Sequence, residues 1–192
     1  MKPIFEMLAG YSEWANRRLY DAAASLDDAD FRADYGAFFG LVHGTLNHLL
    51  VGDRVWMHRF TGEGPSPARL DEILYEDFAG LRAAREQEDA RIAAYVGSLA
   101  LSDLDRTIRY HTISNPDDIE QELKLALLHV FNHQTHHRGQ AHCLLTRITD
   151  AAPSLDLILY QRETGLDQRE TGLGLVSGAP AASTGPQRRA VR

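Results

Sequence analysis

Five of the nine histidines in this 192-residue chain lie within fourteen residues, between His129 and His142, in the segment HVFNHQTHHRGQAH. Neutral imidazole nitrogens bind divalent transition metals, and histidine can also transfer protons near neutral pH. Leucine-rich sequence on both sides of the segment predicts a helix. The segment is therefore a candidate metal site, and its ligands depend on which histidines share one face of that helix.

A helical wheel separates these histidines. At about 100° per residue, His129, His133, His136 and His137 occupy about one third of the circumference, and His142 lies on another side. His137 lies about 40° from the centre of the apolar face and His133 about 80°, whereas His129 and His136 lie about 120° and 140° away. The wheel thus places His133 and His137 nearest the protein interior, with the i, i+4 spacing by which two imidazoles reach one ion.

A mononuclear site needs a third protein ligand and keeps a position open for water or substrate. A second predicted helix offers His43, His48 and His58, and the wheel does not separate His43 from His48, since both flank its apolar face. His43 and His58 are expected to be surface or boundary residues. Asp53 falls near the middle of the apolar stripe, where a carboxylate needs partners, and orienting a ligand imidazole is one such use.

Helices are needed to position these side chains, and apolar residues recur at three- and four-residue steps in four long stretches. The predicted helices cover about residues 4–26, 36–60, 70–99 and 119–149. The β-branched, alternating sequence of 107–113 predicts a short extended segment before the last long helix. We therefore expect an all-α fold, a four-helix bundle, in residues 1–163. After Pro153, SLDLILYQRE fits either a strand or a helix capped by Ser154.

Composition and charge indicate where the folded domain ends and exclude several functions. A repeated RETGL and a Gly-, Ala-, Ser- and Pro-rich stretch predict a flexible tail over 164–192. The net charge of −7 and the scattered basic residues argue against a nucleic-acid partner. No signal-peptide core or membrane-length apolar run is present, so we expect a cytoplasmic protein without a membrane partner. Cys143 is the only cysteine, which excludes an intramolecular disulfide, and we expect it in the core.

Three segments carry a family resemblance. They are YSEWANRRL (11–19), TLNHLLVGDRVW (45–56) and NHQTHHRGQ (132–140). Together they resemble the DinB-like (DinB/YfiT) family of bacterial four-helix-bundle proteins over roughly residues 4–163. The resemblance implies an up-down-down-up bundle with a divalent metal, zinc or nickel, held by His48, His133 and His137. It thereby selects His48 where the wheel leaves His43 and His48 open.

The resemblance also implies a type of activity. The wider superfamily includes transferases and isomerases that use low-molecular-weight thiols, and members are often dimeric. We therefore expect a homodimeric metal-dependent enzyme acting on a small molecule, as a thiol S-transferase or a hydrolase; the alternative is a non-catalytic metal-binding stress-response or interaction module. An ion on three neutral imidazoles lowers the pKa of bound water to about 7 or holds a thiol as thiolate. The candidates for proton transfer are His43, Asp53 and His136.

Overall fold

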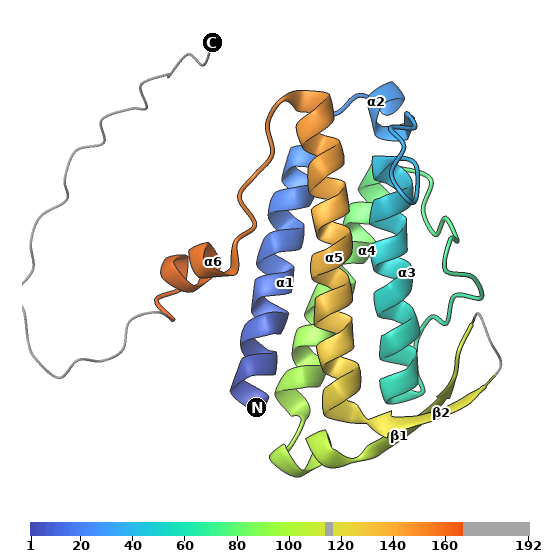
Figure 1. The fold of residues 1–192 in the computed structure, drawn as a ribbon, viewed down its shortest axis with the longest axis vertical. Coiled ribbons are helices and arrows are strands. Elements are labelled where there is room, and N and C mark those ends of the chain that lie inside the picture. Colours follow the sequence, from blue (N-terminus) through green and yellow to red (C-terminus); the bar gives the residue numbers. More distant parts are fainter. Residues whose placement is uncertain (114–116, 167–192) are drawn as a thin grey trace, which may run out of the picture.

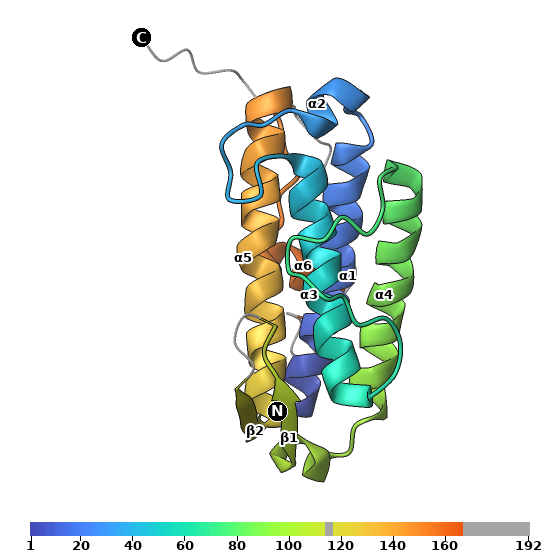
Figure 2. The same cartoon turned by 90° about the vertical axis from the view of Figure 1, so that its right-hand side faces the viewer.

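Four long helices dominate the computed structural model, which describes residues 1–113 and 117–166. They are α1 (Lys2–Ala23), α3 (Val42–Thr61), α4 (Phe78–Ser98) and α5 (Leu123–Thr149). The four lie side by side, with α1 and α5 running in one direction and α3 and α4 in the other (Figures 1 and 2). Two shorter helices are α2 (Asp28–Arg32) and α6 (Leu157–Glu163). The predominantly helical fold expected from the sequence is confirmed.

Each long helix packs against two others. α1 contacts α4 and α5, and α3 contacts the same two helices. The interior holds one apolar cluster around Trp56 and Phe131 and another around Leu49 and Leu145. Between the stretches that belong to the two clusters, every long helix carries at least one buried polar residue: Ser12 and Asn16 on α1, Asp53 on α3, Arg85, Glu88 and Asp89 on α4, and Gln134, His137 and Arg138 on α5. The middle of the protein is therefore a buried polar layer between two apolar layers.

The helix predicted over 36–60 begins six residues later, at Val42. Gly36 and Gly40 have φ angles of 77° and 73°, which place them in the left-handed region that glycine tolerates, and the chain turns there instead of continuing a helix. Phe38, whose spacing fits the apolar stripe of the predicted helix, is 83% exposed in this turn. α3 ends at Thr61, and the next residue, Gly62, is a left-handed C-cap with a φ of 74°.

The helix predicted over 70–99 also begins later, at Phe78. The Asp77 side chain accepts a hydrogen bond from the Gly80 amide at 2.7 Å and caps the helix there. Residues 63–77 instead form a non-helical loop between α3 and α4. This loop becomes important at the candidate site.

The extended segment is present as β1 (Thr107–His111), and it pairs antiparallel with β2 (Asp118–Glu122). Because β2 takes up residues expected in the last long helix, α5 starts at Leu123 rather than near 119. After Pro153 the chain is helical, but Asp156 rather than Ser154 is the N-cap of α6. Most of the predicted tail, residues 167–192, lies outside the described residues. Within the described part, no helix is both long enough and apolar enough to cross a membrane.

Candidate metal centre

His48, His133 and His137 converge between α3 and α5. One ring nitrogen from each lies within 4.8 Å of the other two, and this is the group of potential metal ligands found among the described residues. Along α5 the burial follows the helical wheel: His137 is 8% exposed and His133 is partly buried, while His129 and His136 are exposed. The structure thus brings together the three histidines that the sequence singles out.

Hydrogen bonds fix which nitrogen of two rings faces the cluster. The Nδ1 atom of His48 lies 2.7 Å from the carbonyl oxygen of Leu70, and Nδ1 of His137 lies 2.7 Å from Oε1 of Gln140. A carbonyl oxygen only accepts hydrogen bonds, so both Nδ1 atoms donate, and in neutral rings both Nε2 atoms carry lone pairs. Such outer contacts are typical of metal-bound histidines.

The two Nε2 lone pairs point at each other. Nε2 of His48 and Nε2 of His137 are 3.1 Å apart, and with both Nδ1 atoms donating elsewhere this contact has no proton to share between neutral rings. Two nitrogens bound to one tetrahedral zinc ion at 2.0–2.1 Å lie about 3.3 Å apart. The spacing and the facing lone pairs therefore fit a divalent ion coordinated between the rings.

Burial keeps these rings neutral. Loss of solvent lowers the pKa of His48 below its ordinary value. Burial lowers the pKa of His133 to about 3, with a further lowering by neighbouring histidines, and lowers that of His137 to about 4. A histidine must be deprotonated to bind a metal. The environment therefore supplies the ligand form of the imidazoles at neutral pH.

Two further residues shape the cluster. The Phe39 ring stacks on His48, with ring centroids 3.9 Å apart, and lies 5.6 Å from the ring of His137. On α3, Gly52 lies against His133, where an added Cβ would be 2.9 Å from Cε1 of that ring. His133 thus occupies space that only a glycine at position 52 leaves free.

The loop that carries Leu70 is held by Asn47. Its Oδ1 accepts hydrogen bonds from the amides of Leu74 and Tyr75 at 2.9 and 3.0 Å, and its Nδ2 donates to the carbonyl oxygen of Tyr75 at 3.1 Å. The residue directly before His48 therefore anchors the loop whose backbone orients His48. The sequence did not predict four residues of this site: Phe39, Asn47, Leu70 and Gln140. Two of them carry a signal in the sequence, because Asn47 directly precedes His48 and Gln140 follows His137 by about one helical turn.

The other candidate histidines lie outside the cluster. His43 is 3% exposed rather than a surface or boundary residue; its Nε2 donates to the Tyr75 carbonyl oxygen at 2.8 Å. His58 is partly buried near the end of α3. His136 is exposed, with its ring centroid 4.8 Å from that of His137. The proton-transfer roles of His43 and His136 stay predictions. Cys143, expected in the core, is exposed.

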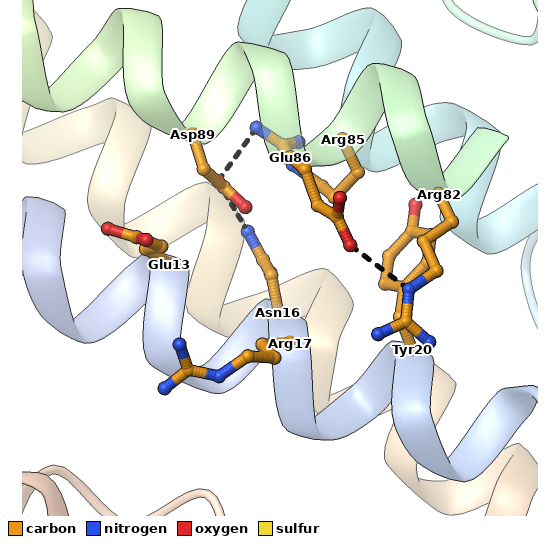
Figure 3. Close-up of a pocket in the computed structure, with 8 residues that line it drawn as sticks. All are labelled: Glu13, Asn16, Arg17, Tyr20, Arg82, Arg85, Glu86 and Asp89. Atoms are coloured by element: carbon orange, nitrogen blue, oxygen red, sulfur yellow. Dashed lines mark hydrogen bonds and ion pairs between the residues drawn. The ribbon is translucent and has the colours of Figure 1, made fainter. Parts of the chain in front are cut away.

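Asp53 belongs to the buried polar layer. It is 1% exposed and forms an ion pair with Arg85 at 2.6 Å, while Gln134 donates a hydrogen bond to it. Arg85 also pairs with Asp89 at 3.0 Å, and Asn16 donates to Asp89 at 2.9 Å (Figure 3). The partners of Asp53 are therefore an arginine and an amide, and not the ligand imidazole considered from the sequence. Its proton-transfer role stays a prediction.

The same layer reaches the ligand-bearing helix. Gln134 and Arg138 directly follow His133 and His137, and Nη1 of Arg138 donates to Oε1 of Gln134 at 3.0 Å. With Asp53, Asp89, Arg85 and Arg138 all ionised, the charges of these four side chains sum to zero, which reduces the cost of burying them. Side chains from all four long helices meet here. The layer therefore ties α5 to its neighbours at the height of the histidine cluster.

A mostly helical fold with three buried or partly buried histidines on two adjacent helices defines a class of candidate metal-binding proteins. Comparison with known families identifies one of them. The sequence model of the DinB family matches residues 1–171, so this chain belongs to the DinB family. The chain is also similar to Protein DinB of Bacillus subtilis (strain 168). The two are 26% identical over 156 residues, which cover 78% of this chain and 89% of that protein. The family resemblance read from the sequence motifs is confirmed.

Proposed function

We propose that this protein is a metal-dependent enzyme in which His48, His133 and His137 hold one divalent ion, and that its four long helices form the up-down-down-up bundle expected of the family. The observation that carries the proposal is the pair of Nε2 atoms of His48 and His137, 3.1 Å apart, with both Nδ1 atoms directed to acceptors. Three neutral imidazoles leave the full charge of the ion uncompensated and leave a coordination position for a reactant.

The ion, zinc or nickel, would act as a Lewis acid that makes a thiol or a water molecule nucleophilic near neutral pH. The chain itself supplies orientation, through Leu70 and Gln140, and a partly dry environment, through Phe39. His136 is the best placed of the candidate proton carriers, because its ring is exposed and lies 4.8 Å from that of His137. These features support a thiol S-transferase or a small-molecule hydrolase.

Turnover of a panel of low-molecular-weight thiols with activated electrophiles, and of small esters and amides, tests the proposal. The metal-loaded wild-type protein should turn over at least one pair, and His133→Ala should lose that activity. His58→Ala is the control, since it removes a histidine from α3 outside the cluster. A metal-loaded protein that binds no thiol and turns over nothing in the panel would instead favour a non-catalytic metal-binding module. The homodimer, the small-molecule substrate and the cytoplasmic location stay predictions.

A further inference from the structure

A large pocket lies on the flank of α5 beside the histidine cluster. Its volume is about 600 Å³, within the range of small-molecule sites. One wall is the outer side of α5, and the other is the turn before α3. The lining residues that the argument uses are Tyr35, Phe38, His136, Gln140 and Arg147.

None of the three clustered histidines lines the pocket, but residues of both walls connect it to the cluster. Gln140 accepts the hydrogen bond from His137, and the His136 ring is 4.8 Å from the His137 ring. On the opposite wall, the Phe38 ring meets the Phe39 ring at 4.9 Å, and Phe39 stacks on His48. One end of a ligand in this pocket would therefore lie against His136 and Gln140, which contact His137.

The charge of the lining points to an anion. Arg147 is the one permanent cation among the residues that line this pocket, and the lining contains no Asp or Glu. Its guanidinium lies 5.7 Å from the centroid of the Tyr35 ring, and no carboxylate of the described residues forms an ion pair with it. In a chain of net charge −7, an arginine without an acidic partner in a pocket is available to a ligand.

The rest of the lining sets the shape of the ligand. Phe38 is 83% exposed, so an apolar or aromatic body could cover a surface that water now contacts. Arg147 follows His137 by ten residues, which corresponds to about 15 Å along the helix axis. A ligand that extends from Arg147 to the level of His137 is therefore elongated.

Building on the proposed function, we infer that this pocket binds an elongated small-molecule carboxylate. Its anionic group pairs with Arg147, its apolar body packs against Phe38, and its other end lies against His136 and Gln140, next to the histidine cluster. The substrate class of the proposed enzyme is accordingly an aryl or alkyl carboxylic acid carrying its reactive group at the end remote from the carboxylate.

Binding of 4-phenylbutanoate and of its neutral analogue 4-phenylbutanamide to the full chain, followed by NMR titration, tests the inference. The wild type should prefer the carboxylate by on the order of fivefold, the upper range for an exposed ion pair. Arg147→Gln should abolish this preference without changing the affinity for the amide. Phe38→Ser should weaken the binding of both ligands and keep the preference for the carboxylate. Arg17→Gln is the matched control, because Arg17 is also exposed and lines a different pocket.

Chelator-treated protein separates this inference from the metal proposal. Without the ion, the preference for the carboxylate should persist, since it depends on Arg147. If it disappears on chelation and survives Arg147→Gln, the carboxylate binds the ion and the inference is wrong. Equal affinities of the wild type for the carboxylate and the amide would also overturn it. If the protein binds no metal but the wild type still prefers the carboxylate, the proposed function is wrong and the anion site remains supported.

Discussion

His48 and Leu70 are joined by a hydrogen bond of 2.7 Å from the imidazole Nδ1 to a backbone carbonyl oxygen. His48 lies in the regular helix α3, whereas Leu70 lies in the irregular loop between α3 and α4. The bond fixes the tautomer of the neutral ring and turns its Nε2 lone pair toward His137. The loop therefore determines the chemical state of a candidate metal ligand without contributing a side chain to the cluster.

The first prediction concerns metal content. Protein purified without a histidine tag should contain about one divalent ion per chain, and His48→Ala should lose most of it, because two imidazoles hold an ion more weakly than three. His58→Ala, on the same helix, should keep the wild-type content. Elemental analysis of the purified proteins measures this directly. A fully folded wild type without a divalent ion would contradict the assignment of the ligands.

The second prediction concerns pH. The folded-state pKa values of His133 and His137, about 3 and about 4, lie below the ordinary value of 6.5, so between these values the unfolded chain binds more protons. The stability of chelator-treated protein should therefore be unaffected by these groups above pH 6.5 and should fall as the pH drops from 6.5 toward 4. Melting temperatures over this range measure the effect. In His133→Leu the decline should be shallower; an identical decline would show that His133 is not held neutral by the fold.

The choice of His133 and His137 over His129 and His136 was accessible from the sequence, because α5 is a regular helix of 27 residues and the wheel applies along all of it. His43 and His48 are different. Both are buried, at 3% and 5% exposed, and they differ in what their rings face. What each ring faces depends on the path of residues 63–77, and the helical period of α3 carries no information about this path. The family resemblance, rather than the helical wheel, therefore selected His48 over His43.

The errors in the helix boundaries have identifiable causes. Leu70 and Ile73 extend the helical period of α4 toward the N-terminus. The loop is not helical, however, because the Leu74 amide donates a hydrogen bond to Asn47, 27 residues earlier in the chain. Phe38 fits the period of α3, but the glycines on either side of it break the helix. β2 has the sequence DIEQE, which has low strand propensity, and it forms because β1 offers an edge. In each case a tertiary contact or a turn overrides local periodicity.

The third prediction concerns Gly52. A methyl group there would lie 2.9 Å from Cε1 of His133, so Gly52→Ala should displace that ring and weaken metal binding by on the order of tenfold. Gly97→Ala is the matched control, because that glycine is also helical and a Cβ there meets nothing within 4 Å. It should leave metal affinity unchanged and stabilise the fold by about 0.5–1 kcal/mol. Competition with a chromophoric chelator and urea unfolding measure the two quantities. Equal metal affinities for the two alanine variants would refute the steric argument.

The fourth prediction concerns Asn47. Asn47→Ala leaves the amides of Leu74 and Tyr75 without their acceptor and releases the loop that presents Leu70 to His48. We expect a loss of metal affinity of about 10- to 100-fold, as for other residues that orient metal ligands. Thr45→Val is the control, since it removes one hydrogen bond of the same helix, to Leu41, but keeps the loop contacts. The chelator competition should show a loss only in Asn47→Ala. A comparable loss in both variants would mean that general destabilisation is the cause.

The fifth prediction separates a structural from a catalytic role of Asp53. Its ion pair with Arg85 is 2.6 Å long, and both side chains are at most 2% exposed. Removing one charge of such a pair leaves the other buried and uncompensated, so Asp53→Asn should lower the free energy of unfolding by about 3–5 kcal/mol. Asp71→Asn breaks an exposed pair with Arg69 and should have almost no effect, because surface pairs contribute little.

Urea unfolding measures both changes, and a double-mutant cycle makes the argument specific to the pair. Adding Arg85→Gln to Asp53→Asn should cost less than Arg85→Gln costs in the wild type, because the charge left without its Asp53 partner is removed as well. Additive effects would mean that the two side chains do not stabilise each other. If Asp53→Asn instead keeps wild-type stability but abolishes turnover, the carboxylate acts in the reaction, and its place in the buried polar layer is secondary.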